Sequence, residues 1–562
     1  MLRIAVIDER NGIAELLVKQ LRESQIVESC ERFPQVGSDP NGCVASLLNE
    51  QNIDTVVYSP PLLSRRCSIP QLDDAENIFR QCQKSGKVKR VILLSSAEIY
   101  GASPQNPGLI SETRQPGRSG QNFIADQWVE LERAALEHLG GKAAAALAIL
   151  RPVPVLVPDG DDYHSWFFRK RMAVTLPGHD PSIQLLSAED LALAVRCAIE
   201  NGAEGIYNVA PDGVIPLRKA LRLSGSKRLP VPRTLQRIAR ALLKPLGLAH
   251  SITQLDYIRY SWTVSNEKIK SELGFTPRRS SSQALADFTI SKPIGRTAKS
   301  LPTPPFDDFG YDKNYVEAFG RTLFNFLEHY YWRVELRGLE NLPREGPVVL
   351  VGLHRGFMPW DGIIVIHQIL KLTGRCPRFL LHPGLVKPPF VANFMTKIGG
   401  VIACQENSNR VLERGEILGV FPEGVKGAFS LYRDAYRLGR FLRNDFVKIA
   451  LRYQAPIVPF ITVGSAEIFP ILKKIEWSWW KRHTDWPCLP LTTPLPLPSK
   501  WHTQFLTPIR LEGIYPPTAA EDPVTVRAIS QEVRNAMEQA IEKILTRRKS
   551  IFYGSVFEEE AG

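Results

Sequence analysis

The chain of 562 residues is longer than one ordinary hydrophobic core, so we expect two or more domains. Its hydrophobic fraction of 44% and charged fraction of 23% are typical of a globular protein and exclude a globally disordered chain. The net charge of +12 indicates anionic partners. No Lys/Arg block is interleaved with aromatic residues, so we expect no nucleic-acid partner.

The cysteines and the apolar segments indicate the compartment. The eight cysteines are scattered without a CxxC pair, which argues against a metal site or a disulfide framework and fits a reducing cytoplasm. The apolar run Ile4–Ile7 is short and ends at an acid, so it predicts a strand and not a signal peptide. No window of about 18 uninterrupted apolar residues exists, so we expect any membrane contact to be peripheral.

The first half alternates between short apolar runs and amphipathic segments. This alternation predicts an α/β domain with a parallel sheet and helices on both faces. The expected strands are Arg3–Ile7, Thr55–Tyr58, Arg90–Leu94, Ala146–Leu150 and Gly205–Val209, and the expected helices include Gly12–Leu21 and Asp73–Ser85.

Several motifs in this half have a familiar form. Ser95-Ser96-Ala97-Glu98-Ile99-Tyr100-Gly101 is followed by Leu150-Arg151-Pro152, by Ser187–Ala192 and by Gly205–Val209. With these motifs, residues 1–288 resemble the extended short-chain dehydrogenase/reductase family of NAD-dependent epimerases and dehydratases. The resemblance implies a Rossmann-like fold.

The chemistry of that family is not preserved here. Asp8, Asn11 and Ala14 stand where the family's dinucleotide-binding turn has three glycines, which let the backbone approach a pyrophosphate. Phe123 and Gln127 replace its catalytic tyrosine and lysine, and neither can carry the proton transfer. We therefore expect a domain that has lost oxidoreductase activity and uses no NAD(P).

The region that joins the halves is basic and then rich in proline. Leu235–Lys244 has apolar residues at three- and four-residue spacing, which favours a core helix with a solvated basic side over a helix lying on a bilayer. Residues 289–313 contain Lys292-Pro293 and Leu301-Pro302-Thr303-Pro304-Pro305, which predict a stiff linker. Residues 314–562 would form the second domain, opened by an aromatic-rich helix over Tyr315–Glu335.

Two polar segments in the second half each follow a short apolar run that predicts a buried strand. The first follows Val348–Val351 and contains His354 and Asp361, separated by six residues. Gly356 and Pro359 disfavour a helix through this segment, so we expect a folded loop that enters a helix at Asp361. Such a loop would let Asp361 orient the His354 ring, which leaves the other ring nitrogen as a general base.

The second polar segment follows Ile417–Phe421 and reads Pro422-Glu423-Gly424-Val425-Lys426. We expect this turn to form an anion-binding corner beside His354. Polar groups released at the ends of buried strands are where α/β enzymes commonly place their chemistry.

These segments resemble the glycerol-phosphate and lysophospholipid acyltransferase family. That family has a His and an Asp separated by four residues, then a Phe-Pro-Glu-Gly block, which is intact here as Phe421–Gly424, and a later Val-Pro, here Val458-Pro459. The resemblance implies an α/β acyltransferase domain fused to the Rossmann-like domain. It implies transfer of a fatty acyl group from acyl-CoA or acyl carrier protein to a glycerolipid hydroxyl, with no cofactor and no metal.

The same resemblance implies roles for individual residues. His354 would deprotonate the acceptor hydroxyl, and Asp361 would hold the ring. Gln405 stands where the family usually has an arginine, and Arg410 would take its place. The substrate-binding residues would be Pro422, Glu423, Gly424, Lys426, Arg410 and Pro459.

Two further features suggest contact with an anionic membrane. Four arginines recur at helical spacing and predict a basic helical stripe: Arg433, Arg437, Arg440 and Arg443. This stripe is either a solvated face or a docking site for an anionic partner. The segment Ile475–His483, with Trp486, Trp501 and the Pro/Leu-rich run Leu489–Pro498, favours a bilayer interface. We therefore expect a cytoplasmic protein on the inner face of the membrane.

Two other functions remain open from the sequence. One is a non-catalytic sensor whose first half binds a nucleotide or lipid head group and whose second half docks on a membrane. The other is an active bifunctional NAD(P)-dependent reductase and acyltransferase.

Overall fold

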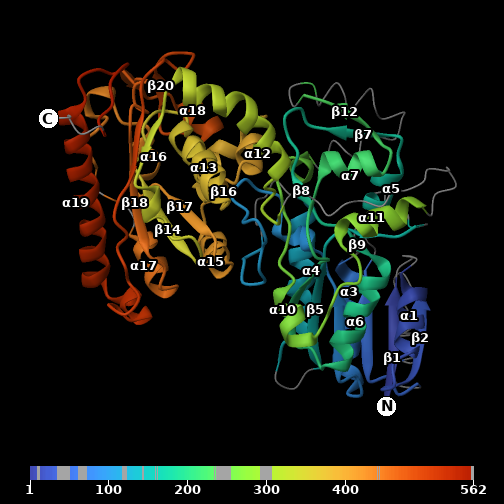
Figure 1. Ribbon diagram of the computed structural model, residues 1–562. Helices are drawn as coiled ribbons and strands as arrows, with labels where there is room; N and C mark the ends of the chain where they lie inside the picture. Colours follow the sequence, from blue (N-terminus) through green and yellow to red (C-terminus); the bar gives the residue numbers. More distant parts are fainter. Residues whose placement is uncertain are drawn as a thin grey trace. The chain divides into compact units, whose positions relative to one another are not determined.

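The computed structural model describes residues 1–8, 13–34, 48, 51–60, 72–116, 123–141, 145–158, 160, 162–232, 235, 255–290, 307–439, 441 and 444–557. The chain forms two compact units, Met1–Gly310 and Tyr311–Gly562 (Figure 1). Three segments from the sequence analysis fall largely or wholly outside the described residues: the turn at 9–12, the basic segment at 236–244 and linker residues 291–306.

The first unit is built on a six-stranded, fully parallel sheet in the order β10-β5-β4-β3-β1-β2. The strand order changes direction between β1 and β3, which gives a doubly wound sheet. Its strands are β1 (Leu2–Asp8), β2 (Val27–Pro34), β3 (Thr55–Ser59), β4 (Arg90–Leu94), β5 (Ala146–Pro152) and β10 (Gly205–Val209).

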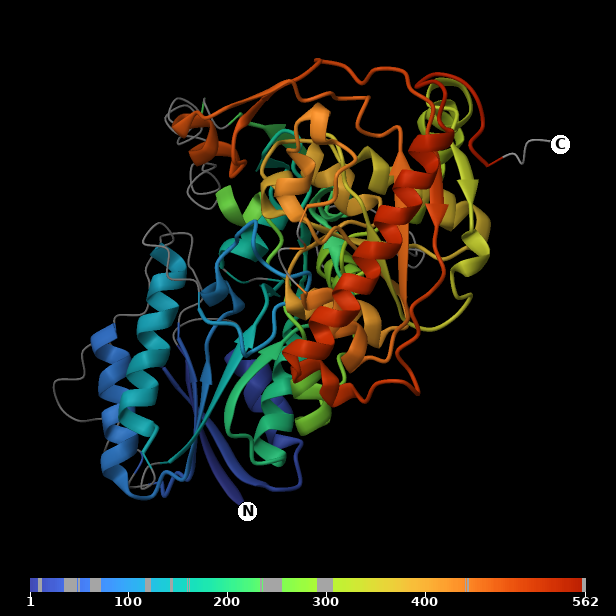
Figure 2. The same ribbon diagram turned by 90° about the vertical axis from the view of Figure 1, so that its left-hand side faces the viewer.

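Four helices cover the two faces of this sheet. Figure 2 shows α3 (Leu72–Ser85) and α4 (Phe123–Leu139) on one face, with α1 (Ala14–Arg22) and α6 (Ala188–Glu200) on the other. Each has an apolar stripe at three- and four-residue spacing, such as Ala75, Ile78, Phe79 and Cys82 of α3, that packs onto the strands. The α/β fold with a parallel sheet predicted for this half is confirmed.

A smaller subdomain, with its own apolar core, extends the first unit. Three short strand pairs belong to this part of the unit, namely β6 (Val155–Leu156) with β9 (Leu186–Ser187), β7 (Met172–Thr175) with β12 (Lys227–Pro230), and β8 (Ser182–Ile183) with β11 (Ile215–Pro216). The short helices α5 (Tyr163–Arg169), α7 (Leu217–Leu223) and α11 (Ser281–Ile290) contribute to this subdomain core. The helix α10 (Glu267–Leu273) and the 3-10 turn η1 (Ala97–Tyr100) pack on the core of the parallel sheet, and the 3-10 turn η3 (Leu255–Ile258) contributes to both cores.

The second unit is built on a seven-stranded mixed sheet in the order β13-β21-β18-β14-β17-β15-β16. Only the β18–β21 pair is antiparallel, so β18, β14, β17, β15 and β16 run in one direction. The strands are β13 (Glu335–Arg337), β14 (Val348–Gly352), β15 (Arg378–Leu381), β16 (Val401–Ile402), β17 (Ile417–Val420), β18 (Ile457–Val463) and β21 (His502–Phe505), and a separate hairpin pairs β19 (Lys473–Ile475) with β20 (Leu489–Leu491).

Helices connect these parallel strands. The longest, α19, packs against β18 and α17 (Figures 1 and 2). The helices are α12 (Lys313–Phe319), α13 (Trp360–Thr373), α14 (Val391–Lys397), α15 (Gln405–Glu413), α16 (Gly424–Ala428), α17 (Asp445–Arg452), α18 (Ser478–Thr484) and α19 (Pro523–Arg547), and the 3-10 turns are η6 (Leu339–Asn341), η7 (Pro383–Val386), η8 (Tyr432–Asp434) and η9 (Pro517–Glu521). None of the helices in the described ranges is long and apolar enough to cross a membrane.

The aromatic helix expected over Tyr315–Glu335 differs in its bounds and in its turns. It begins with α12 at Lys313 and continues through two π-helical turns, η4 (Gly320–Phe324) and η5 (Leu327–Tyr331). It cannot extend to Glu335, because Arg333 has a positive φ of 44° and Glu335 already belongs to β13.

Two tryptophans expected at a bilayer interface are buried instead. Trp501 is fully buried and stacks on Trp332, with ring centroids 4.4 Å apart. Trp486 is 9% exposed and packs against Phe357. Both side chains belong to the interior of the second unit.

Candidate active site

Strand pairing brings together the ends of β14 and β17. Val351 lies opposite Val420 in this parallel pair, so the segments that follow the two strands emerge side by side. β18 flanks β14 on its other edge, with Pro459 opposite Val351. The polar segments after β14 and β17 are therefore neighbours in space.

His354 and Asp361 lie within hydrogen-bonding distance despite the six residues between them. His354 Nδ1 is 2.8 Å from Oδ1 and 2.9 Å from Oδ2 of Asp361. The Asp361 side chain is fully buried and also accepts hydrogen bonds from the backbone N–H groups of Arg355 and Gly362. Four short contacts thus fix the carboxylate against the histidine ring.

The loop between them folds back as the sequence predicts. Gly356 has a φ of +93°, a conformation that glycine adopts without strain, and Pro359 immediately precedes α13. Asp361 lies in the first turn of α13, as expected. The N-cap position is Pro359, and the Asp361 carboxylate accepts from His354, from the backbone N–H of Arg355 and from the first-turn N–H of Gly362.

This geometry leaves one ring nitrogen of His354 available for proton transfer. A carboxylate can only accept, so Nδ1 carries the proton and Nε2 of the neutral ring is an acceptor. No hydrogen-bond partner of Nε2 is found within the described ranges, and the side chain is 11% exposed. The Phe421 ring packs beside the imidazole, with centroids 5.0 Å apart.

An ion pair that the sequence analysis missed connects the two polar segments. Arg355, only 1% exposed, donates from Nη1 to Oε2 of Glu423 at 2.6 Å and from Nη2 to Oε1 at 3.1 Å. Glu423 also accepts from the backbone N–H of Gly439 at 2.7 Å. Both carboxylate oxygens of Glu423 are therefore bonded within the protein, which makes Glu423 a brace between the segments.

Arg355 also determines the shape of the loop after η8. Its guanidinium donates to the carbonyl oxygens of Ala435 and Arg437. This loop was expected to be a helix with an arginine stripe, and that expectation is wrong for the described residues. η8 is a single 3-10 turn over Tyr432–Asp434, and turns follow it, because two of its carbonyl groups point toward Arg355. Arg440 and Arg443 lie outside the described residues.

A second buried cluster supports the same loop. Tyr436 donates to Glu467 and accepts from the backbone N–H of Gly464 at 2.8 Å. Glu467 also pairs with Arg548, just beyond the end of α19. Burial, and then the nearby Glu467 carboxylate, raise the pKa of Tyr436 well above its ordinary value. The Tyr436 hydroxyl therefore stays protonated and anchors the loop.

The other residues expected to bind substrate occupy varied positions. Gly424 is exposed at the start of α16 with a φ of +58°, and Lys426 is exposed on the same short helix. Pro422 is half-buried just before Glu423, Pro459 is buried within β18, and Arg410 is 9% exposed on α15. Their roles in binding stay predictions.

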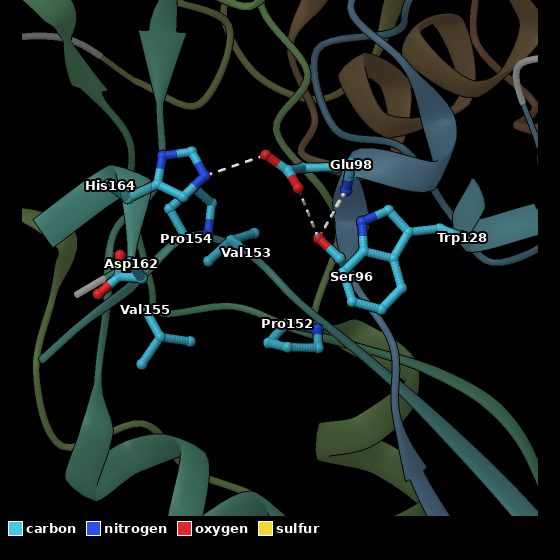
Figure 3. A pocket seen from close by; sticks show the side chains of 9 residues that line it. All are labelled: Ser96, Glu98, Trp128, Pro152, Val153, Pro154, Val155, Asp162 and His164. Atoms are coloured by element: carbon cyan, nitrogen blue, oxygen red, sulfur yellow. Dashed lines mark hydrogen bonds and ion pairs between the residues drawn. The ribbon is translucent and has the colours of Figure 1, made fainter. Parts of the chain in front are cut away.

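The first unit contains a small cavity lined by polar and apolar side chains (Figure 3). Glu98 is buried, and its Oε1 lies 3.0 Å from His164 Nε2. Ser96 accepts a hydrogen bond from the backbone N–H of Glu98 at 3.1 Å and so caps η1. Trp128 and Asp162 also line the cavity. The Glu98–His164 pair was not foreseen, because nothing local in the sequence relates two residues so far apart.

The described residues contain no cluster of three or more His, Cys, Asp or Glu side chains suited to a metal ion.

One family model matches part of the second unit. The family model described as "Acyltransferase" matches residues 333–463, which include His354, Asp361 and Glu423. The chain is 32% identical over 145 residues to phytyl ester synthase 2, chloroplastic, of Arabidopsis thaliana, covering 24% of this chain and 20% of that protein.

A solved structure is similar to about half of the chain. It is MoeE5 in complex with UDP-glucuronic acid and NAD, with 17% identity, a TM-score of 0.40 and coverage of 51% of this chain and 98% of that one. An uncharacterized protein of Mycobacterium tuberculosis is 36% identical over 260 residues, which cover 44% of this chain and 72% of that protein. The chain therefore belongs to the same family as this mycobacterial protein, and its second half contains an acyltransferase domain.

Proposed function

We propose that the chain transfers a fatty acyl group from acyl-CoA or acyl carrier protein to a hydroxyl of a glycerol-phosphate or lysophospholipid acceptor. His354 acts as the general base. The observation that carries this proposal is the 2.8 Å contact between His354 Nδ1 and Asp361 at the carboxyl end of β14. The acyltransferase match over residues 333–463 supports the reaction class.

The proposed reaction is a direct transfer without a covalent enzyme intermediate. Nε2 of His354 removes the proton from the acceptor hydroxyl as its oxygen attacks the thioester carbonyl carbon. The tetrahedral intermediate collapses with cleavage of the carbon–sulfur bond. The thiolate leaves with the proton from the imidazolium, which restores neutral His354. Asp361 keeps the ring in the required tautomer and stabilises the imidazolium.

The exposed Lys426 supports a phosphate-bearing acceptor, because a lysine contacts phosphate as a point charge. A second acceptor class is a long-chain alcohol without phosphate. The similarity to phytyl ester synthase 2 of Arabidopsis thaliana favours it. The two classes differ in their expected dependence on Lys426.

Acyl transfer with a panel of donors and acceptors tests the proposal. Purified full-length protein is supplied with labelled acyl-CoA or acyl carrier protein and with glycerol 3-phosphate, a lysophospholipid or a long-chain alcohol. We expect His354→Ala to lower the rate by about 10² to 10⁴, the usual contribution of a general base. His329→Ala, at an exposed histidine of the same unit, is the matched control and should keep the rate.

Lys426→Gln identifies the acceptor class. It should raise the KM for phosphate-bearing acceptors and leave that for an alcohol unchanged. Full activity in His354→Ala would refute the proposed mechanism. No turnover with any donor and acceptor would favour the non-catalytic sensor instead.

A further inference from the structure

A hairpin beside the candidate active site exposes an unusual number of large apolar side chains. It consists of β19, α18 and β20, residues 472–491, and we call it the tryptophan hairpin. Figure 1 shows α18 and β20 near the same end of the second unit. The two strands pair only with each other, outside the seven-stranded sheet. Its exposed apolar residues are Leu472 at 68%, Ile475 at 40%, Trp477 at 49%, Trp479 at 53% and Leu491 at 49%.

The apolar surface continues beyond the hairpin. Leu495 is 73% exposed in the segment that follows β20. That segment is joined to the aromatic helix, because Tyr331 donates to the carbonyl oxygen of Pro496 at 2.7 Å. The same helix exposes Phe326 and Tyr330, which are stacked on each other. Exposed apolar residues so gathered indicate a binding surface.

The charges around this surface favour an anionic bilayer over a protein partner. Tryptophan together with lysine and arginine is the composition of the interface between water and lipid. The hairpin exposes four cations, Lys473, Lys474, Lys481 and Arg482. Its two carboxylates are Glu476 and Asp485, of which Asp485 pairs with Lys387.

The buried side of the hairpin is packed on the candidate active site. Trp486 lies edge-on to Phe357, with centroids 4.5 Å apart, and also contacts Phe429. Phe357 is three residues after His354, and Phe429 directly follows α16. Trp480 packs on Trp486 from α18. One aromatic cluster thus connects the exposed hairpin to both loops of the site.

We propose that the tryptophan hairpin inserts into the surface of an anionic phospholipid bilayer and presents the His354 loop to lipids held there. This inference deepens the proposed acyl transfer, on which its catalytic consequence rests. The insertion itself depends only on the hairpin. Trp477 and Trp479 lie at the interface, the four cations contact anionic head groups, and Trp486 stays buried in the protein.

Vesicle binding by the full chain tests the insertion. Phosphatidylcholine vesicles with and without phosphatidylglycerol are sedimented with the protein, and tryptophan fluorescence is measured with brominated lipids. We expect Trp477→Ala/Trp479→Ala to lower the partition coefficient at least tenfold and to remove most of the bromine quenching. The matched control Ile514→Ala/Val524→Ala, at exposed apolar residues elsewhere in the unit, should bind as the wild type does.

Equal vesicle binding by the tryptophan variant and the wild type would overturn the inference. If light scattering then also detects a concentration-dependent dimer that the tryptophan variant abolishes, the occupant of the surface is a second copy of the chain.

Activity measurements separate this inference from the proposed function. With an acceptor below its critical micelle concentration, Trp477→Ala/Trp479→Ala should turn over as the wild type does. With an acceptor embedded in vesicles, its rate should fall at least tenfold. Unchanged rates on both substrates, with His354→Ala inactive, would refute the insertion and keep the acyl transfer. If Trp477→Ala/Trp479→Ala loses vesicle binding while neither the wild type nor any variant transfers an acyl group, the insertion stands and the acyl transfer is refuted.

Discussion

Arg355 and Glu423 form a two-pronged ion pair beneath the candidate active site, with Nη1 of Arg355 2.6 Å from Oε2 of Glu423. Arg355 directly follows His354, and Glu423 belongs to the block after β17. The pair therefore sets the distance between the two segments. Both side chains are buried, so water cannot solvate either charge. Loss of one partner would therefore leave the other as an uncompensated buried charge.

Removal of either partner should destabilise the second unit. Arg355→Met or Glu423→Gln alone leaves a buried charge without its partner, at a cost of about 3–5 kcal/mol. The double variant Arg355→Met/Glu423→Leu should recover part of this stability but no activity, because the loop at 435–439 loses its hydrogen bonds to Arg355. Urea unfolding and acyl transfer measure the two effects. Single variants as stable as the wild type would disprove the role of the pair.

Asp361→Asn should lower the rate more than it lowers stability. The Asp361 oxygens accept from His354 Nδ1 and from two backbone N–H groups, so an amide places an NH₂ group against a donor. We expect a loss of about 1–3 kcal/mol from that contact. The rate should fall by about 10²- to 10⁴-fold because the ring loses its tautomer. Calorimetry and kcat measurements separate the two, and an unchanged kcat would contradict the proposed role of Asp361.

Gly352→Ala tests how closely the end of β14 is packed. A Cβ at this position would lie 2.2 Å from Cζ of Phe460 and 2.8 Å from Cε1 of Phe421. Ring displacement should cost about 1–3 kcal/mol and shift His354, two residues further on. Gly141→Ala is the control, because a Cβ there has no atom within 4 Å. Equal urea midpoints for the two variants would show that the site tolerates the displacement.

His179 should make the first unit sensitive to acid. Burial, with a smaller effect of Arg259, lowers the pKa of His179 from 6.5 to about 4. As the pH falls, the unfolded chain therefore protonates this histidine before the native chain does. The contribution of neutral His179 to the free energy of unfolding is complete above pH 6.5 and is lost as the pH falls toward 4. The loss between pH 7.5 and 5 is about 2 kcal/mol. In urea unfolding, His179→Gln should weaken the pH dependence, and an identical dependence in both proteins would refute the assignment.

NAD⁺ and NADP⁺ should not raise the unfolding temperature of the chain. A ligand bound to the native state stabilises it by mass action, so a functional dinucleotide site would produce a shift at millimolar concentration. Asn11 and Ala14 replace two of the glycines that such a site needs. A clear, saturable shift would instead revive the bifunctional reductase and acyltransferase.

The sequence predicted the framework of both units well. Apolar runs placed β4 and β10 at the bounds seen in the structure, and β1, β3, β5 and β14 within two residues. β2 (Val27–Pro34) was missed because three of its eight residues, Glu28, Glu31 and Arg32, are charged and interrupt the apolar pattern. As the edge strand it needs less apolar surface than its neighbours.

The candidate site was predicted less evenly. His354 and Asp361 were identified from loop-forming residues between them, which is local information. Arg355 was overlooked because its partners lie 68 to 82 residues further along the chain, and only strand pairing brings them near. The helix predicted from the spacing of Arg433 and Arg437 is wrong for the same reason. The guanidinium of Arg355, distant in the sequence, binds carbonyl groups that a helix would use for its own hydrogen bonds.

The way in which Arg355 holds its neighbouring loop has a consequence for how this protein can diverge. It contacts main-chain oxygens of Ala435 and Arg437, so the Arg437 side chain, 86% exposed, takes no part in that support. The side chains of the loop at 435–439 can then change among proteins that descend from this one, while the backbone contacts that hold the catalytic residues stay in place. Substrate preference and reaction chemistry are in this sense inherited separately.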